Sequence, residues 1–338
     1  MRSSSGWRDM RLPSDSEVWS ITEEMEGLIV VVGGSGYLGM HLLQSLSIHF
    51  RRLAFTYFSH PPSPALCAAI PHARPFAVDL RSGDGFSSIS NEMGPPQVVI
   101  NCAAVSIPRE CEADPVSARS INVPHALISW LSSLSDVDPP LLVQLSTDQV
   151  YEGTKSFYKE DDEAKPVNTY GRSKLEAEQL IMETWHNYAI LRSSIIYGPE
   201  AIVQVPKSLP IQWMMEVLRS GKGADFFMDE FRSPVFVKDI VRMVEVLAKK
   251  KIDKEPTMQL LLNAGGPQRL SRAEMAEIVA EVGGFDKSLI RHIRAASVNR
   301  GVASPADISM DMSRCISTFG ITLTPFRDGV EQTLKLHF

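Results

Sequence analysis

The run Leu28-Ile-Val-Val-Val32 leads directly into Gly33-Gly-Ser-Gly-Tyr-Leu-Gly39. A short, continuous, β-branched run is typical of a parallel strand that is covered on both faces. The glycines have the spacing Gly-x-x-Gly-x-x-Gly, and apolar residues then recur at helical spacing from Leu38 to Leu46. Strand, glycine turn and helix in this order predict a dinucleotide site, because glycines let a pyrophosphate approach the N–H groups of a helix N-terminus. A turn with a purely structural role is the alternative.

The glycine turn supplies the first group of predicted cofactor-binding residues. They share a position between the strand and the first helical turn, and they are Gly33, Ser35, Gly36, Tyr37, Leu38 and Gly39.

The residues after the next predicted strand, Leu53–Phe58, indicate which cofactor is bound. It ends about 20 residues past the glycines, where an NAD site places an acidic residue for the ribose 2′-OH. This chain has Ser59 and His60 there, which we expect to lie beside the ribose. The missing carboxylate favours NADP. NAD stays open, because the nearest arginines, Arg51 and Arg52, precede the strand.

Two further strands are predicted to border the cofactor. Phe76–Leu80 is expected to form the third strand, with Asp79 and Leu80 facing the adenine; a turn or capping role for Asp79 is the alternative. Val98–Ile100 is expected to form the fourth. The residues expected to contact the cofactor beyond it are small or polar, and they are Cys102, Ala103, Ala104 and, in the following helix, Asn122.

A fifth strand, Leu141–Leu145, ends in Ser146-Thr-Asp148. Open α/β sheets bind ligands at the carboxyl ends of their strands, so the Thr147 hydroxyl is expected to hydrogen-bond a substrate carbonyl. Capping of the next turn is the alternative role of this threonine.

Tyr170 and Lys174 are the strongest catalytic candidates. The run Leu175–Glu183 is rich in helix formers, so both residues should begin a helix, and a spacing of four places them on one face. An ammonium group beside a phenol stabilises its anion and suits it to proton transfer with a carbonyl oxygen. Tyr151 and Lys155 have the same spacing, but the intervening Gly153 predicts a loop.

The remaining elements predict a Rossmann-type doubly wound parallel sheet with a smaller C-terminal α/β substrate-binding lobe. We expect a disordered extension over residues 1–26 and an NAD(P)-binding Rossmann domain over 27–193. Residues 194–338 should form mainly the lobe, with 236–265 returning to the Rossmann domain. The elements expected in this part are strands at Tyr188–Arg192, Ser194–Tyr197 and Gln259–Asn263, and helices at Ile211–Arg219, around Ile240–Leu247 and at Met275–Val282.

Composition narrows the functional classes. The chain has 338 residues, 44% hydrophobic, and a net charge of −6, which gives no reason to expect nucleic acid or a membrane as partner. Its four cysteines have no Cys-x-x-Cys spacing, so neither a zinc site nor a disulfide framework is expected. No run approaches the ~18 apolar residues of a membrane span. Acidic residues near the N-terminus argue against a transit peptide, so we expect a cytoplasmic protein.

Together these motifs resemble the extended short-chain dehydrogenase/reductases over residues 27–335. Five segments are similar to the dTDP-4-dehydrorhamnose reductase (RmlD-like) family and to the related regulatory beta subunits of methionine adenosyltransferase: Ser146–Gly153, Tyr158–Asp161, Asn168–Glu178, Leu191–Gly198 and Pro325–Val330. The segments Cys102–Pro108 and Thr324–Arg327 are closer to the second group.

The resemblance implies a function and roles for individual residues. Thr147, Tyr170 and Lys174 would form a catalytic triad that reduces the 4-keto group of a deoxysugar nucleotide with NAD(P)H. Gln149, where both groups usually carry tyrosine, and Arg232, a candidate phosphate ligand, would contact the substrate. The alternative is a non-catalytic, NADP-binding partner of the methionine adenosyltransferase catalytic subunit. A homodimer is a further expectation.

Overall fold

A seven-stranded parallel sheet is the centre of the molecule. The structure is a computed structural model that describes residues 26–134, 138–206 and 209–335. The strand order is β11-β6-β5-β4-β1-β2-β3, and every neighbouring pair is parallel. The strands of this sheet are β1 (Ile29–Val32), β2 (Leu53–Tyr57), β3 (Ala73–Ala77), β4 (Val98–Asn101), β5 (Leu141–Thr147), β6 (Tyr188–Ser193) and β11 (Gln259–Ala264).

Helices cover both faces of the sheet, as the continuous apolar strands require. In β1, Ile29 and Val31 pack on one face with α1 and α9, whereas Val30 and Val32 pack on the other with α3, α6 and α7. This alternation follows from the two-residue repeat of a strand. The helices around the sheet are α1 (Tyr37–Leu46), α2 (Pro64–Ala69), α3 (Phe86–Met93), α4 (Pro108–Ala113), α5 (Pro115–Asn122), α6 (His125–Ser132), α7 (Thr169–Thr184), α9 (Val237–Ile252) and α11 (Ser313–Phe319).

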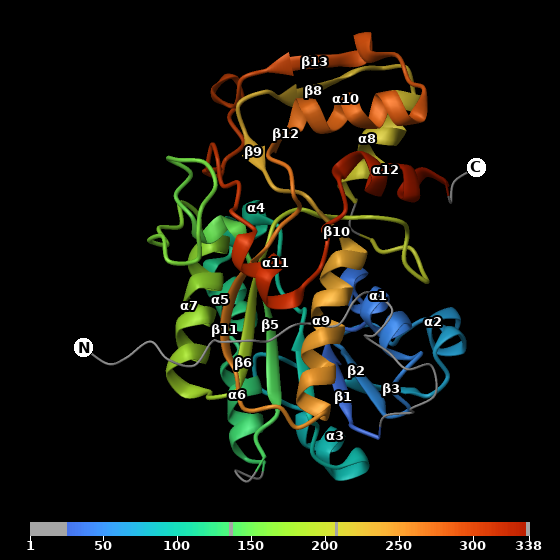
Figure 1. Cartoon of the computed structure of the whole chain (residues 1–338), viewed down its shortest axis with the longest axis vertical. Helices are drawn as coiled ribbons and strands as arrows, with labels where there is room; N and C mark the ends of the chain where they lie inside the picture. The colour runs from blue at the N-terminus through green and yellow to red at the C-terminus, as the bar shows by residue number, and fades with distance from the viewer. Residues whose placement is uncertain (1–25, 135–137, 207–208, 336–338) are drawn as a thin grey trace.

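A smaller lobe lies beyond one end of the sheet, at the top of Figure 1. It has a separate apolar cluster, and its strands β8 (Ala224–Phe227) and β13 (Ile290–Ile293) pair in parallel. Its helices are α8 (Pro210–Arg219), α10 (Arg272–Gly283) and α12 (Phe326–Leu334). The short strands β7 (Ile196–Tyr197), β9 (Phe231–Arg232), β10 (Val235–Phe236) and β12 (Leu270–Ser271) form two further pairs.

The doubly wound α/β fold predicted from the sequence is confirmed. One strand was misplaced: β3 spans Ala73–Ala77 and ends before Asp79. Pro75 lies within it, which is tolerated because β3 is at the edge of the sheet, where one side of the strand needs no ladder hydrogen bonds.

The predicted disordered extension, residues 1–26, lies outside the described residues except for Glu26. In the part of the chain that the structure describes, no helix combines the length and apolar character that crossing a membrane requires.

Candidate active site

The three catalytic candidates come together from one strand and one helix. Thr147 is the last residue of β5, and Tyr170 and Lys174 lie in the first two turns of α7. Asn168 begins that helix, because its side-chain oxygen accepts a hydrogen bond from the Gly171 N–H at 2.8 Å. All three candidate side chains are buried.

Tyr170 is linked to Thr147 and enclosed by apolar surroundings. Burial raises the pKa of Tyr170, while a side-chain hydrogen bond with Thr147 lowers it. The negative charge of Asp148 raises the Tyr170 pKa further, because it disfavours a second anion nearby. The phenol is therefore held protonated and can act as an acid.

Lys174 has a different immediate partner from the one expected. Its ammonium group donates to the backbone oxygen of Leu145 at 2.5 Å. Burial lowers the pKa of Lys174 to about 8, and the nearby Glu178 carboxylate opposes that shift. Lys174 is not among the groups that shift the Tyr170 pKa, so the expected lowering of that pKa by the ammonium is absent from this arrangement. The reason is geometric, because the ammonium points to β5.

The glycine turn has the shape that a bound pyrophosphate requires. Gly33 has φ of +79° and lies so close to Ala103 that an added Cβ would be 3.0 Å from its backbone. A Cβ on Gly39 would collide with the Gly33 carbonyl oxygen. A Cβ on Gly36, at the start of α1, would meet that oxygen alone, at a tight 3.3 Å, and no other atom beyond its chain neighbours within 4 Å.

The N-terminus of α1 also fits an anion. Gly36 is its N-cap and provides no side-chain hydrogen bond to the first N–H groups of the helix. These groups, with the positive end of the helix dipole, suit a phosphate. Ser35 and Tyr37 flank this cap, and the Tyr37 hydroxyl donates to the Pro199 oxygen at 2.9 Å. Leu38 is buried at the second position of the helix.

The segment after β4 borders the same space. Cys102 follows the strand, and burial raises its pKa to about 12, so its thiol stays neutral. Asn122 accepts a hydrogen bond from the Val105 N–H and donates to the Val105 oxygen and to Ser173. Asn122 therefore holds the chain beyond Ala104 against α7. A direct contact of Asn122 with the cofactor stays a prediction.

The residues predicted for the adenosine end gather beyond β2 and β3. Ser59 and His60 are exposed, and the Ser59 hydroxyl lies 2.8 Å from His60 Nδ1. The Asp79 carboxylate pairs with Arg81, which lowers the Asp79 pKa. Leu80 packs partly buried against the cluster on one face of the sheet. The role of Arg81 was missed in the sequence, although it lies only two residues beyond Asp79.

Arg232 is buried rather than a surface arginine. Its guanidinium donates to the Phe231 oxygen at 2.7 Å and to the Ser304 hydroxyl at 3.2 Å. Its charge also interacts with Asp148, the residue after Thr147. This arrangement connects the lobe to the carboxyl end of β5.

Two further arginines lie near Arg232, and no motif in the sequence indicated them. Burial lowers the pKa of Arg272, the first residue of α10, and the neighbouring charge of Arg232 acts in the same direction, so that this pKa is about 10. Arg300 is bonded to the buried carboxylate of Glu230, with Nη1 3.2 Å from Oε2. These three guanidinium groups therefore lie near the carboxylates of Asp148 and Glu230, and Arg232 also interacts with Asp307, which pairs with Arg269.

The Gln149 side chain takes part in the cap of the catalytic helix. Its oxygen accepts a hydrogen bond from the side-chain nitrogen of Asn168 at 2.8 Å. Its role as a substrate contact stays a prediction. Tyr151, in the pair set aside as a decoy, lies outside any helix and donates from its hydroxyl to Asn263 Oδ1 at 2.7 Å.

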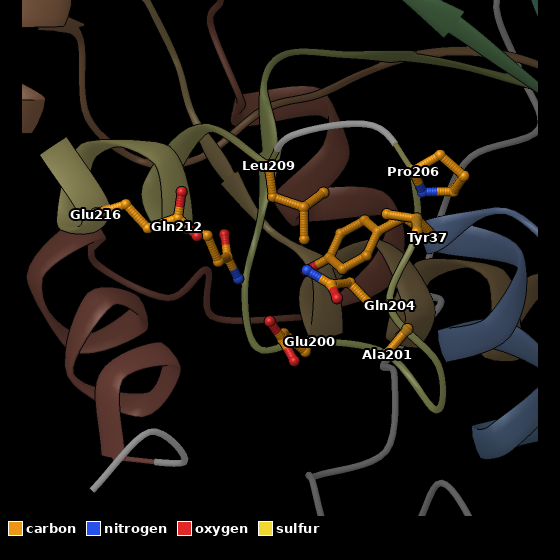
Figure 2. A pocket seen from close by; sticks show the side chains of 9 residues that line it. Tyr37, Glu200, Ala201, Gln204, Pro206, Leu209, Gln212 and Glu216 are labelled. Atoms are coloured by element: carbon orange, nitrogen blue, oxygen red, sulfur yellow. The ribbon is translucent and has the colours of Figure 1, made fainter.

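A cavity of about 210 Å³ lies beside Tyr37, between the chain after β7 and α8 (Figure 2). Its lining includes Glu200, Leu209 and Gln212, and none of the three catalytic candidates. The catalytic candidates therefore lie at the carboxyl end of β5 and the start of α7 and do not line this cavity.

The model of the RmlD substrate binding domain matches residues 26–337 of this chain. The chain belongs to the RmlD substrate binding domain family. The match includes the glycine turn, the three catalytic candidates and the arginines of the lobe.

Relatives of known name fall into two groups, a methionine adenosyltransferase subunit and a reductase. Methionine adenosyltransferase 2 subunit beta from Bos taurus is 30% identical over 240 residues, which cover 71% of this chain and 70% of that protein. The probable low-salt glycan biosynthesis reductase Agl14 from Haloferax volcanii is 25% identical over 299 residues, covering 88% of this chain and 94% of that protein.

Solved structures share the fold of this RmlD family member. A dTDP-4-dehydrorhamnose reductase from Bacillus anthracis in complex with NADP has a TM-score of 0.73 at 19% identity, covering 92% of this chain and 99% of its own. A dTDP-glucose 4,6-dehydratase from Streptomyces venezuelae, solved with NAD, has a TM-score of 0.74 at 22% identity, covering 91% and 96%. The expected membership of an RmlD-like group close to the methionine adenosyltransferase beta subunits is thus confirmed.

Proposed function

We propose that this protein binds NADP, with NAD as the weaker alternative, and reduces the 4-keto group of a deoxysugar nucleotide. The observation that carries the proposal is the burial of Thr147, Tyr170 and Lys174 at the end of β5 and the start of α7, in a chain whose glycine turn leads into the uncapped N-terminus of α1. The dehydrorhamnose reductase with NADP that shares the fold supports it.

The reduced nicotinamide supplies the hydride for the substrate carbonyl. Thr147 orients the carbonyl oxygen, and Tyr170 gives its proton to that oxygen, because its raised pKa keeps the phenol protonated. The Lys174 ammonium hydrogen-bonds the ribose hydroxyls of the cofactor. Cys102, Ala103 and Ala104 form the small-residue surface on the other side of the cofactor space.

The lobe supplies the charge for an anionic substrate. With Arg269, which pairs with Asp307, the three arginines Arg232, Arg272 and Arg300 outnumber the nearby carboxylates of Asp148, Glu230 and Asp307, so the cluster retains positive charge. Guanidinium groups bind phosphate oxygens through paired hydrogen bonds. We propose that these arginines receive the diphosphate of a nucleotide sugar. On this proposal, the lobe outside residues 236–265 is the substrate-binding part and residues 27–193 hold the cofactor.

The test is NADPH oxidation with a dTDP-4-keto-6-deoxy sugar, followed by the nicotinamide absorbance. Wild type should turn over, and Tyr170→Phe should lose about 100-fold or more of kcat with NADPH affinity retained. Tyr151→Phe is the matched control, because it removes a buried tyrosine hydroxyl outside the site. NADPH binding without turnover would contradict the reductase proposal.

A second function is favoured by the sequence relatives, which carry the name methionine adenosyltransferase 2 subunit beta. On this alternative, the protein binds the catalytic subunit of that enzyme and retains the cofactor as a structural element. Co-elution of the two purified chains, with altered kinetics of the catalytic subunit, would support it. Separate elution at micromolar concentrations would oppose it. A homodimer, detectable in the same run by mass, remains a proposal.

A further inference from the structure

We propose that Arg81 binds the 2′-phosphate of the cofactor and, with Ser59 and His60, gives this protein its preference for NADP. The inference rests on the proposed cofactor binding and adds a specificity residue to it. An NADP site needs a cation near the ribose, and no arginine lies at the end of β2, where such a site usually has one. The structure brings an arginine to that point from the turn after β3.

The turn after β3 lies against the end of β2. The Val78 N–H donates to the oxygen of Tyr57, the last residue of β2, at 2.9 Å. The Arg81 guanidinium then lies over the ring of Phe58, 4.9 Å from its centroid. Because Phe58 directly precedes Ser59, this contact places the positive charge of Arg81 at the carboxyl end of β2.

Asp79 holds the guanidinium in one orientation. Its Oδ1 accepts from the Arg81 N–H and from Nε, both at 2.9 Å, and its Oδ2 accepts from Nη2 at 2.8 Å. Nη1 takes no part in this pair, so its two N–H groups can meet a phosphate oxygen. The Arg81 side chain is 46% exposed, which leaves it within reach of a ligand. An arginine held on one edge by a carboxylate and on one face by a ring loses little freedom on binding.

Ser59 and His60 complete the polar surface. Both are exposed, and their side chains lie 2.8 Å apart, so a hydroxyl and an imidazole face the same space. The segment from Phe58 to Ser63 contains no acidic residue that could accept the 2′-OH of NAD or repel a phosphate. Asp79, the nearest carboxylate along the chain, is paired with Arg81.

Arg74 provides a matched control on the neighbouring strand. It is also an exposed arginine, it pairs with Glu92, and its guanidinium lies 5.7 Å from the centroid of the Phe76 ring. It thus has the same kinds of contact as Arg81, but within β3 and not beyond the ends of the strands.

The experiment is calorimetric titration of the full-length protein with 2′,5′-ADP and with 5′-AMP, which differ by the 2′-phosphate. In Arg81→Ala, we expect affinity for 2′,5′-ADP to fall about 10- to 100-fold and affinity for 5′-AMP to change less than about twofold. Arg81→Lys should lose an intermediate amount of affinity for 2′,5′-ADP, because lysine keeps the positive charge but lacks the paired N–H donors of a guanidinium. Arg74→Ala should match wild type with both ligands.

Equal losses for the two ligands in Arg81→Ala would overturn the inference, since they would indicate a contact with the adenosine rather than the 2′-phosphate. Unchanged affinities would overturn it as well. In both cases, retained NADPH binding by wild type would leave the proposed function intact. Failure of wild type to bind NADPH or NADH at all would instead remove the proposed function, and this inference with it.

Discussion

At the scale of single residues, the site depends on charged groups that are buried together. Glu178 accepts hydrogen bonds from Ser146, the residue before Thr147, and from Arg192. The same carboxylate helps to keep Lys174 protonated. One acidic residue on α7 therefore connects both elements that carry the catalytic candidates.

Lys174→Met should stabilise the cofactor-free protein near pH 7. The folded-state pKa of Lys174 is about 8, below its ordinary value of 10.5, so the folded protein disfavours the ammonium form. The resulting loss of folding stability is fully present below pH 8. It disappears as the pH rises from about 8 to 10.5, because the ammonium then loses its proton. The Leu145 oxygen keeps its hydrogen bond from Gln144.

Thermal unfolding at pH 7 and at pH 10 measures this effect. The stabilisation by Lys174→Met should be large at the lower pH and smaller at the higher. A variant that is less stable than wild type at pH 7 would contradict the expectation. Turnover should be lost at both values.

Glu178→Gln should destabilise the protein by about 3–5 kcal/mol, because it leaves the buried Arg192 without its counter-ion. The control is Glu176→Gln, two residues earlier in α7, which breaks an exposed pair with Arg119 and should cost less than about 1 kcal/mol. Urea unfolding compares the two variants. Similar losses in both would show that the buried pair has no special importance.

At the scale of elements, the start of α7 decides where Tyr170 lies. Asn168 caps this helix and donates from its side chain to Gln149 and to the Ala303 oxygen. The cap therefore fixes the first turn against both the chain after β5 and the lobe.

Asn168→Ala should cost about 1–2 kcal/mol of stability and also lower kcat, because the first turn of α7 loses its attachment. Asp286→Ala removes the side-chain cap of the short 3₁₀ turn Lys287–Leu289, outside the residues proposed for catalysis or binding, and should cost up to about 2 kcal/mol of stability without lowering kcat. Urea unfolding and steady-state kinetics separate the two effects. Equal kcat values in the two variants would argue against a positioning role of Asn168.

At the scale of the whole molecule, cofactor binding should stabilise the sheet through its carboxyl edge. NADP at about 100 times its Kd should add about 2.7 kcal/mol to the free energy of unfolding. Gly36→Val should fold, because its Cβ meets one atom, the Gly33 oxygen at 3.3 Å, and a shift of a few tenths of an ångström relieves that contact; it should lose this stabilisation, since the added side chain fills the space for the pyrophosphate.

Thermal shift with and without NADP provides the measurement. Wild type should shift by several degrees and Gly36→Val should not. An equal shift in the variant would count against the glycine turn as the pyrophosphate site.

Much of this protein is determined by its sequence, where neighbouring residues act on one another. The apolar run before Gly33 predicts a buried parallel strand, and the spacing from Tyr170 to Lys174 predicts one helix face; both elements occur in the structure. The spacing of Ser271 and Glu274 is that of a capping box, and the box forms at the start of α10. Each of these features lies within one strand, one turn or one helix, so local propensity and periodicity suffice.

Only the tertiary structure decided the features that join distant segments. Arg81 reaches Phe58 because β3 pairs with β2, and Arg232, Arg272 and Arg300 meet because the lobe folds back on the end of β5. The Lys174 ammonium donates to the Leu145 oxygen because α7 packs against β5. Burial and charge at these points depend on which distant segments pack together, and the spacing of residues along the sequence does not predict that packing.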